Sequence, residues 1–349
     1  MKTHAASGTA GAAPDFIPAW FLRSPHLQTL WGRLARPSGA MKLRREVLIT
    51  PDDDELVLDH LDAPASPLHF ILLHGLEGSS NSVYIQGLLS VIARHGFAAT
   101  AMNFRSCARD PRHLSRMLPN RRPRFYHSGE TTDFDFVLRT LAAREPAVTF
   151  VAAGASLGGN QLLKWLGEHP GQNLLHAAAA MSVPFDLAAG GAHLEKGIGP
   201  VYVERFLKSL RPKVRAVWDR FPEVRQKIDF AKTMRARSFR EFDDAATAPL
   251  HGMRDADDYY TSCSSIYFLD RIDTPTLVLT ALDDPFVPPP VPQRARQAAS
   301  AAIDFRVTPH GGHVGFVSGS TPWNCRYWAE ELLVNWLAKA ANERQSLAS

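Results

Sequence analysis

The sequence has only three cysteines among its 349 residues, Cys107, Cys263 and Cys325. They lie far apart, no two form a C-x-x-C pair and their number is odd, so their spacing indicates neither a disulfide framework nor a zinc site. His310 and His313 stand close together, but the sequence offers no obvious third and fourth ligand for a tetrahedral metal centre. We therefore expect a protein of a reducing compartment without a metal site.

Long apolar runs are also missing. No stretch of 18 apolar residues occurs, so no transmembrane helix is predicted. The first 14 residues, MKTHAASGTAGAAP, lack the apolar core of a secretory signal. These absences predict a cytoplasmic protein without an integral membrane segment. Transient contact with a membrane surface stays open. We also expect residues 1–14 to be disordered.

Neither sign of charge dominates, because 39 Lys and Arg stand against 35 Asp and Glu. The densest basic stretch is RRPR, Arg121 to Arg124. No aromatic stacking platform or nucleic-acid-binding motif accompanies it, so we interpret it as a solvated loop and expect no nucleic-acid partner. A hydrophobic content of 45% with 21% charged residues is typical of a globular protein with a sizeable core. The length suits one large domain with an insertion or two ordinary domains.

From residue 69 onward, short and continuous apolar runs alternate with helical patterns. Such runs are typical of strands buried on both faces, and their alternation with helices predicts a doubly wound, mostly parallel sheet. Before them, two alternating runs predict an antiparallel hairpin, and an aromatic-rich arm over 15–34 shows no helical or strand period. The predicted strands are 45–50, 55–61, 69–74, 97–104, 147–154, 177–183, 276–281 and 304–309. The predicted helices are 82–94, 130–144, 157–168, 291–301 and 323–341.

This alternation breaks once, between Pro184 and about Asp273, where the sequence is helical, charged and aromatic. A segment of roughly 90 residues is too long for a loop. We expect a largely helical insertion over residues 185–262, the cap segment, which covers an α/β body made of 15–184 and 263–349. Several apolar side chains recur there at helical spacing, and we expect most of them to pack the cap and a few to line an acyl channel: Val201, Tyr202, Phe206, Leu207 and Trp218.

The stretch VAAGASLGGN, residues 151–160, sets Ser156 between Gly154 and Gly158, directly after a buried strand and before an amphipathic helix. Small residues at these positions permit a sharp strand-to-helix turn that exposes the serine hydroxyl as a nucleophile. The turn lies at the carboxyl edge of the sheet, where open α/β folds place their sites.

A serine nucleophile needs a base and a group that orients the base. The loop after strand 276–281 holds Asp283 and Asp284, and the loop after strand 304–309 holds His310 and His313. Both loops emerge at the same edge as Ser156, in the chain order Ser, acid, His of this kind of fold. On these grounds one acid and one histidine reach Ser156, and either member of each pair could do so.

Two backbone N–H groups are the candidates for an oxyanion hole. One is the amide of Leu157, after the nucleophile, and the other is that of Leu76 in the loop LLHGLEGSS, whose glycines let the backbone turn its amides inward.

The stretch YHSGET, 126–131, holds a histidine, a serine and a glutamate together. We interpret it as a capped helix start, in which Ser128 or Thr131 accepts from unpaired N–H groups.

Six motifs in order, HGLEGSS, NFRSC, YHSGETTD, GASLGGN, ALDDPF and GGHVGF, together resemble the AB hydrolase 4 family of the α/β-hydrolase superfamily. The family contains bacterial esterases and eukaryotic acylglycerol and phospholipid lipases. The resemblance runs from residue 25 to the C-terminal helix and implies ester hydrolysis by a triad of Ser156, Asp284 and His313, with the acid directly before proline and the histidine after two glycines. The chain departs from the family at Ser106, where glycine is usual, and in its long basic segment 108–125.

We therefore expect an α/β-hydrolase fold, with helices on both faces of the sheet and a helical cap insertion, that acts as a serine hydrolase. Its substrates would be small carboxylic esters with short to medium acyl chains, monoacylglycerols included, and the reaction would need no cofactor. One alternative is an acyltransferase that uses the same triad with an alcohol acceptor. A second is a binding protein that keeps the fold without catalysis. The acyl length, the alcohol portion and the oligomeric state stay open.

Overall fold

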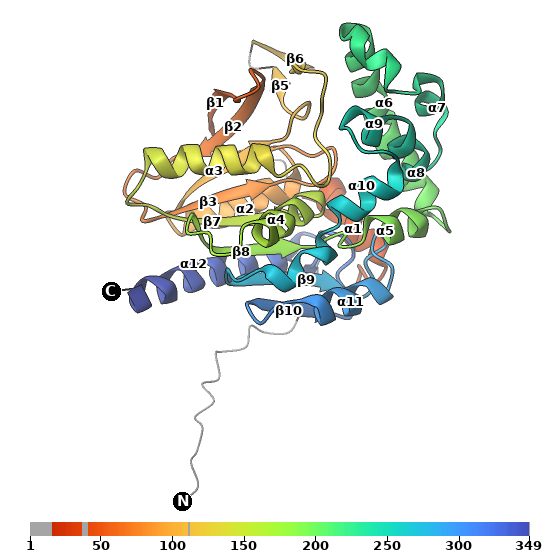
Figure 1. Cartoon of the computed structure of the whole chain (residues 1–349). Coiled ribbons are helices and arrows are strands. Elements are labelled where there is room, and N and C mark those ends of the chain that lie inside the picture. The colour runs from red at the N-terminus through yellow and green to blue at the C-terminus, as the bar shows by residue number, and fades with distance from the viewer. Residues whose placement is uncertain (1–15, 37–40, 111, 349) are drawn as a thin grey trace, which may run out of the picture.

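The computed structural model describes residues 16–36, 41–110 and 112–348. The disorder expected over residues 1–14 concerns a stretch outside this part of the chain. Figure 1 shows a central sheet covered by helices on both faces, with a group of helices at one end.

The central sheet has eight strands in the order β1-β2-β4-β3-β7-β8-β9-β10. Its first two pairings, β1 with β2 and β2 with β4, are antiparallel, and all the others are parallel. The strands are Arg44–Ile49 (β1), Glu55–Leu61 (β2), Leu68–Leu73 (β3), Ala98–Asn103 (β4), Thr149–Ala155 (β7), Leu175–Met181 (β8), Thr276–Ala281 (β9) and Ile303–Thr308 (β10). The mostly parallel sheet predicted from continuous apolar runs is confirmed, because such runs suit strands that helices cover on both sides.

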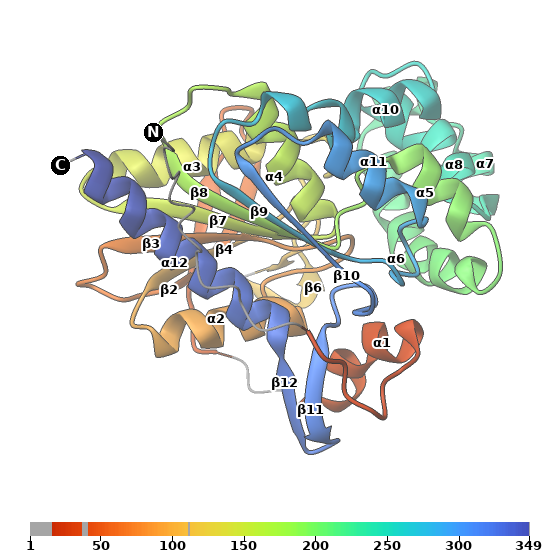
Figure 2. The same ribbon diagram turned by 90° about the horizontal axis from the view of Figure 1, so that it is seen from below.

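Five helices cover the two faces of this sheet, with α2 and α12 on one face and α3, α4 and α11 on the other (Figure 2). Each face has its own core of buried apolar side chains. The helices are Val83–Arg94 (α2), Thr132–Arg144 (α3), Leu157–Glu168 (α4), Pro290–Ala298 (α11) and Trp328–Ala348 (α12).

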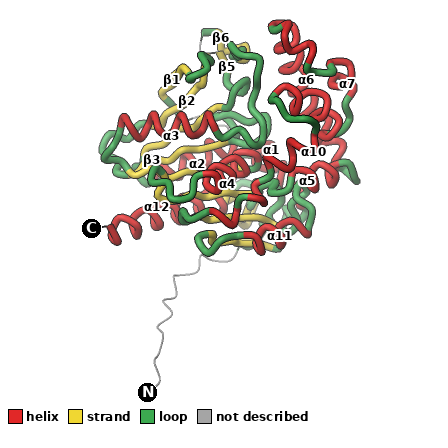
Figure 3. Tube along the Cα trace, viewed as in Figure 1, coloured by secondary structure: helices red, strands yellow, loops and turns green. Residues whose placement is uncertain are grey.

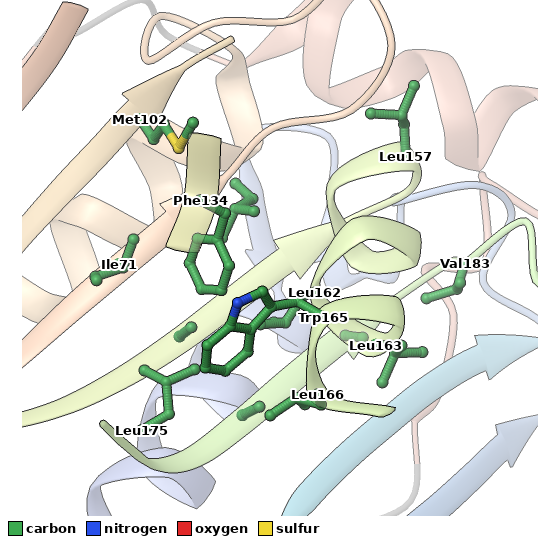
Figure 4. Close-up of a cluster of buried hydrophobic side chains, with 14 of the residues drawn as sticks. Ile71, Met102, Phe134, Leu157, Leu162, Leu163, Trp165, Leu166, Leu175 and Val183 are labelled. Atoms are coloured by element: carbon green, nitrogen blue, oxygen red, sulfur yellow. The ribbon is translucent and has the colours of Figure 1, made fainter. Parts of the chain in front are cut away.

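Helix α4 is held firmly in the core. Its side chains Leu162, Leu163 and Leu166 are buried together with Trp165 (Figure 4). The indole packs edge-on against the Phe134 ring at 5.2 Å between centroids. Truncating a buried tryptophan to alanine typically costs about 3–5 kcal/mol of stability. The helix that begins directly after Ser156 is therefore a rigid base for that residue.

The segment between β8 and β9 consists of helices joined by loops and contains no strand in the described chain, as the colouring of Figure 3 shows. Its helices gather at one end of the sheet (Figure 1) and enclose a hydrophobic cluster of their own. They are Leu187–Leu194 (α5), Gly199–Arg220 (α6), Phe230–Arg235 (α7), Phe239–Phe242 (α8), Ala248–Leu250 (α9) and Ala256–Cys263 (α10), with a π-helical turn over Asp243–Thr247 and short 3₁₀ turns at Pro222–Gln226, Ser265–Tyr267 and Leu269–Arg271.

The N-terminal arm contains a helix, Pro25–Ala35 (α1), where the sequence showed no helical period. The reason is that the buried side chain of α1 is polar. Gln28 donates to the carbonyl oxygens of Leu22 and Val317 and accepts from the Val317 amide. Its one fully buried side chain is thus held by hydrogen bonds, and a search for hydrophobic periodicity misses the helix.

Two further expectations were wrong in detail. The helix predicted over 323–341 begins only at Trp328, because Asn324–Tyr327 (β12) pairs with Val317–Thr321 (β11) as a hairpin beside α1 (Figure 2). The basic segment contains a second small hairpin, Arg109–Asp110 (β5) with His113–Met117 (β6). Its arginines are not simply solvated, since they pair with acidic residues in the turn before β2 and at the start of β2: Arg121 with Glu55, Arg122 with Asp53, and Arg124 with Asp52.

Candidate active site

Ser156 stands at the turn between β7 and α4, with φ of 53° and ψ of −122°. A serine rarely adopts positive φ, and such strain is typical of a nucleophile turn. The flanking glycines make the turn possible, because a Cβ on Gly154 would lie 2.5 Å from the Gly158 carbonyl oxygen and one on Gly158 would lie 2.5 Å from that of His74. The Ser156 amide donates to Met181 of β8 at 2.9 Å, which ties the turn to the sheet.

The structure brings Ser156, His313 and Asp284 together. His313 Nε2 lies 2.9 Å from Ser156 Oγ, and His313 Nδ1 lies 2.9 and 3.1 Å from the two carboxylate oxygens of Asp284. Asp284 and His313 are both buried. Because the carboxylate can only accept, we assign the imidazole proton to Nδ1, which leaves Nε2 to accept from the serine hydroxyl.

The second acid and the second histidine form a separate pair. His310 Nδ1 lies 3.2 Å from Asp283 Oδ2, and Asp283 Oδ1 accepts from the Gly312 amide at 2.9 Å. His310 is exposed. This pair joins the two loops side by side and makes no hydrogen bond with Ser156.

Helix α1 contributes to the placement of His313. The His313 amide donates to Thr29 Oγ1 at 2.9 Å, and a Cβ on Gly312 would lie 2.5 Å from the Pro25 carbonyl oxygen. Val314 follows at φ 56°, with its amide donating to Ser182 Oγ at 2.9 Å. Sequence reasoning missed this role for the N-terminal arm, because nothing in the arm's sequence indicates which loop it touches.

The loop after β3 runs beside the nucleophile, since a Cβ on Gly75 would lie 3.1 Å from the Ser156 Cβ. His74 shapes this loop: its Nε2 accepts from the Phe104 amide, so Nδ1 carries the proton and donates to the Gly75 carbonyl at 2.8 Å. Burial lowers the pKa of His74 to about 3, so the ring stays neutral. Within the described chain, no protein acceptor is recorded for the amides of Leu76 and Leu157, which leaves both available to a ligand.

One ion pair links this loop to α6. Lys213 Nζ binds Glu77 Oε1 and lies 3.4 Å from Cys107 Sγ, and both charged side chains are largely buried. Tyr126 completes the cluster, because its hydroxyl accepts from the Glu77 amide at 2.7 Å and donates to Glu77 Oε1 at 2.8 Å. Glu77 and Tyr126 lie in motifs that the sequence analysis quoted, whereas Lys213 had no signal in the sequence.

A cavity of about 540 Å³ contains Ser156 and His313 in its wall. Its apolar wall includes Tyr202, Phe206 and Leu210 of α6 and Phe286, whose ring lies 4.3 Å from the His313 ring. Of the other α6 residues singled out in the sequence, Val201 is exposed, Leu207 is buried inside the cap cluster and Trp218 stacks on Phe230.

The interpretation of YHSGET needs correction. Neither Ser128 nor Thr131 caps α3; instead the Glu130 carboxylate accepts from the Thr132 amide at 2.9 Å, and the Thr131 hydroxyl donates to Glu168. A carboxylate at this position also interacts favourably with the positive end of the helix dipole.

The part of the chain that the structure describes holds no group of three or more His, Cys, Asp or Glu side chains arranged to bind a metal ion. Among the same residues, no helix combines the length and the apolar character needed to cross a membrane.

Residues 69–320 match the family described as alpha/beta hydrolase fold. The chain belongs to this family. Among its relatives, YheT of Escherichia coli K12, provisionally named an esterase, is 36% identical over 329 residues, which cover 93% of this chain and 94% of YheT. Mouse phospholipase ABHD3 is 32% identical over 313 residues, 86% of this chain and 72% of ABHD3. The solved structure of the Pyrococcus furiosus esterase Pf2001 covers 95% of this chain and 97% of its own at a TM-score of 0.52, with 13% identity, a likeness of fold alone.

Proposed function

We propose that the protein hydrolyses carboxylic esters through a covalent acyl-enzyme on Ser156. Ser156 Oγ attacks the ester carbonyl while His313 Nε2 accepts its proton, and Asp284 stabilises the resulting imidazolium. The amides of Leu76 and Leu157 donate to the oxyanion. The C–O bond to the alcohol then breaks as His313 returns the proton to the leaving oxygen. Water, deprotonated by His313, releases the acid by the same steps.

The observation that carries this proposal is the continuous hydrogen-bond chain from Ser156 Oγ through His313 to Asp284, at 2.9 Å and 2.9 Å, in the wall of a cavity. A nucleophile, its base and the orienting acid within such distances are the geometric requirement for acyl transfer. The relatives named as esterase and phospholipase agree with this chemistry.

The cavity supports small apolar esters as substrates. A volume of about 540 Å³ with an aromatic and aliphatic wall suits ligands of modest size rather than a polymer. We assign the acyl chain to the wall formed by α6 and Phe286, and we propose short- to medium-chain esters, monoacylglycerols among them.

The test uses p-nitrophenyl esters, monoacylglycerols and a fluorophosphonate probe that labels activated serines. Ser156→Ala should lower hydrolysis by about 10⁴-fold or more and abolish labelling. Ser79→Ala is the matched control, because Ser79 lines the same cavity but its hydroxyl accepts only from the Asn81 amide. Labelling of the Ser156→Ala protein would disprove the assignment. Absence of labelling and turnover in the wild type would favour a binding protein.

The acyl-enzyme can also pass its acyl group to an alcohol instead of water. Product analysis with added ethanol or glycerol separates the two outcomes: hydrolysis yields mainly free acid at every alcohol concentration. A new ester as the main product at low alcohol concentration would establish the protein as an acyltransferase.

A further inference from the structure

Asp243 is an acidic side chain in the wall of the same cavity. It begins the π-helical turn Asp243–Thr247, which follows α8 directly. Single turns of π-helix are rare and occur often at functional sites, because the extra residue redirects a side chain. Asp243 is half-buried as a residue and lines the cavity.

The surroundings of Asp243 satisfy the carboxylate only with neutral groups. The Tyr260 hydroxyl donates to Asp243 Oδ2 at 2.9 Å, and the Thr247 hydroxyl donates a second hydrogen bond. Burial raises the pKa of Asp243 to about 7 against these two hydrogen bonds, and no charged neighbour among the described residues offsets it. A carboxylate can accept about four hydrogen bonds, and the hydroxyls of Tyr260 and Thr247 supply two of them here.

The position of this acid relative to the nucleophile is set by Asn160, one turn along α4 from Ser156. Asn160 Nδ2 donates to the carbonyl oxygens of Ser128 and Cys263 at 2.9 and 2.8 Å, and its Oδ1 accepts from the Ser265 amide at 2.9 Å. These bonds hold the C-terminal end of α10 against the nucleophile helix. Helix α10 carries Tyr260, so it fixes the partner of Asp243 on the catalytic body.

Aromatic side chains from α8 and α10 line the same cavity as Asp243. They are Phe239, Phe242, Tyr259 and Tyr260. Gly191 of α5 leaves space on the facing side, since a Cβ there would have only the Tyr260 hydroxyl within 4 Å, at 3.8 Å. A carboxylate among aromatic faces is the combination that binds alkylammonium groups, which pair with the charge and with the ring faces together.

We infer that Asp243 and its aromatic neighbours form a subsite for a positively charged ammonium group on the alcohol portion of the ester. This inference rests on the proposed function and names a substrate class within it, the esters of amino alcohols. The acyl chain lies against α6 and Phe286, and the alcohol portion extends from the scissile carbonyl toward the Asp243 side of the cavity.

Two arginines of the cavity wall, Arg33 on α1 and Arg205 on α6, do not cancel the attraction of Asp243 for a positively charged ammonium group. Both are exposed to solvent. Exposed charges are screened by salt over about 10 Å, whereas a partly buried carboxylate in contact with its ligand is screened much less. Arg36, the third arginine of the wall, is bound to Glu330.

The experiment compares three octanoate esters. Octanoylcholine carries the ammonium group, neohexyl octanoate has carbon in place of its nitrogen, and glycol monooctanoate carries a neutral hydroxyl. Asp243→Asn should lower kcat/KM for octanoylcholine about tenfold and change it less than about twofold for the neohexyl ester. Asp244→Asn is the matched control, because it removes the same charge from an exposed neighbour outside the cavity wall and should leave all three values unchanged.

An equal loss for the choline and neohexyl esters would overturn the inference and make Asp243 a structural residue. A loss confined to the glycol ester would also overturn it, in favour of hydroxyl recognition. Calorimetry on Ser156→Ala with intact Asp243 measures binding without turnover, and octanoylcholine should bind about tenfold more tightly than the neohexyl ester. Equal binding there contradicts the subsite, whereas preferential binding without hydrolysis by the wild type contradicts only the proposed function.

Discussion

The carboxyl edge of the sheet and the cap segment contribute to one cavity in different ways. At the sheet edge, Ser156, Asp284 and His313 follow the ends of β7, β9 and β10, and their loops are held by backbone and side-chain hydrogen bonds. In the cap, the wall consists of side chains on packed helices, joined to the body by a few polar contacts such as Lys213 with Glu77. In the proposed mechanism, the chemistry depends on the fixed positions of these groups, whereas selectivity depends on the shape and charge of the cavity.

Substitutions in the triad at the sheet edge should lower kcat/KM for every ester to the same degree. Asp284→Asn should lower kcat/KM about 10⁴-fold for every ester, because the imidazole loses the acceptor that fixes its tautomer. Asp283→Asn, the matched control in the neighbouring position, should cost less than about tenfold, since Asp283 binds the Gly312 amide and the exposed His310. Steady-state kinetics on one ester decides between them. Equal losses for the two variants would show that the acid is wrongly assigned.

The same pair of acids shows what the sequence could predict. The strands, the order of serine, acid and histidine, and the edge at which they meet all follow from apolar runs and loop positions. The choice of Asp284 over Asp283 does not, because both follow β9 within four residues and spacing cannot determine which side chain turns inward. There the family pattern made the choice that the residues alone could not.

Other parts of the site had no signal of this kind. Helix α1 is attached through the polar Gln28, so its burial leaves no apolar period. Lys213 is a lysine on an amphipathic helix, a position at which most lysines are solvated, and only the folded chain brings it to Glu77. Asp243 likewise differs from other aspartates only in the folded chain, where burial raises its pKa. Long-range partners of charged and polar residues are fixed by tertiary structure.

The link between the two regions can be broken at Lys213. Lys213→Met should lower the free energy of unfolding by about 3 kcal/mol, because Glu77 would remain buried without its counter-charge. The double variant Lys213→Met, Glu77→Gln should recover most of that loss, since it removes both charges. Denaturant unfolding of the single and double variants measures this coupling. If the losses simply add, the ion pair does not join the cap to the body.

The cap wall should alter selectivity without altering the chemistry. Leu210→Phe enlarges a side chain in the cavity wall and should lower kcat/KM for decanoate esters about tenfold, while butyrate esters change less than about twofold. Val201→Phe is the control on the same helix, because Val201 is 68% exposed and is not part of the wall. A chain-length profile that Leu210→Phe leaves unchanged would place acyl selectivity elsewhere, with the basic segment around Arg121 as the next candidate.

The smallest expected effect is a change in the free energy of unfolding, caused by a substitution in the α/β body. Ser106, at the position where the family usually has glycine, has φ of 63°. A residue with a Cβ is strained in this left-handed region by roughly 1 kcal/mol or more relative to glycine, and the greater entropy of glycine in the unfolded chain offsets part of the gain. Ser106→Gly should therefore raise the free energy of unfolding by about 0.5–1 kcal/mol. Ser79→Ala, a serine change without positive φ, is the control in the same denaturant unfolding experiment. A loss of stability in Ser106→Gly would mean that the serine side chain makes contacts worth more than the strain it carries.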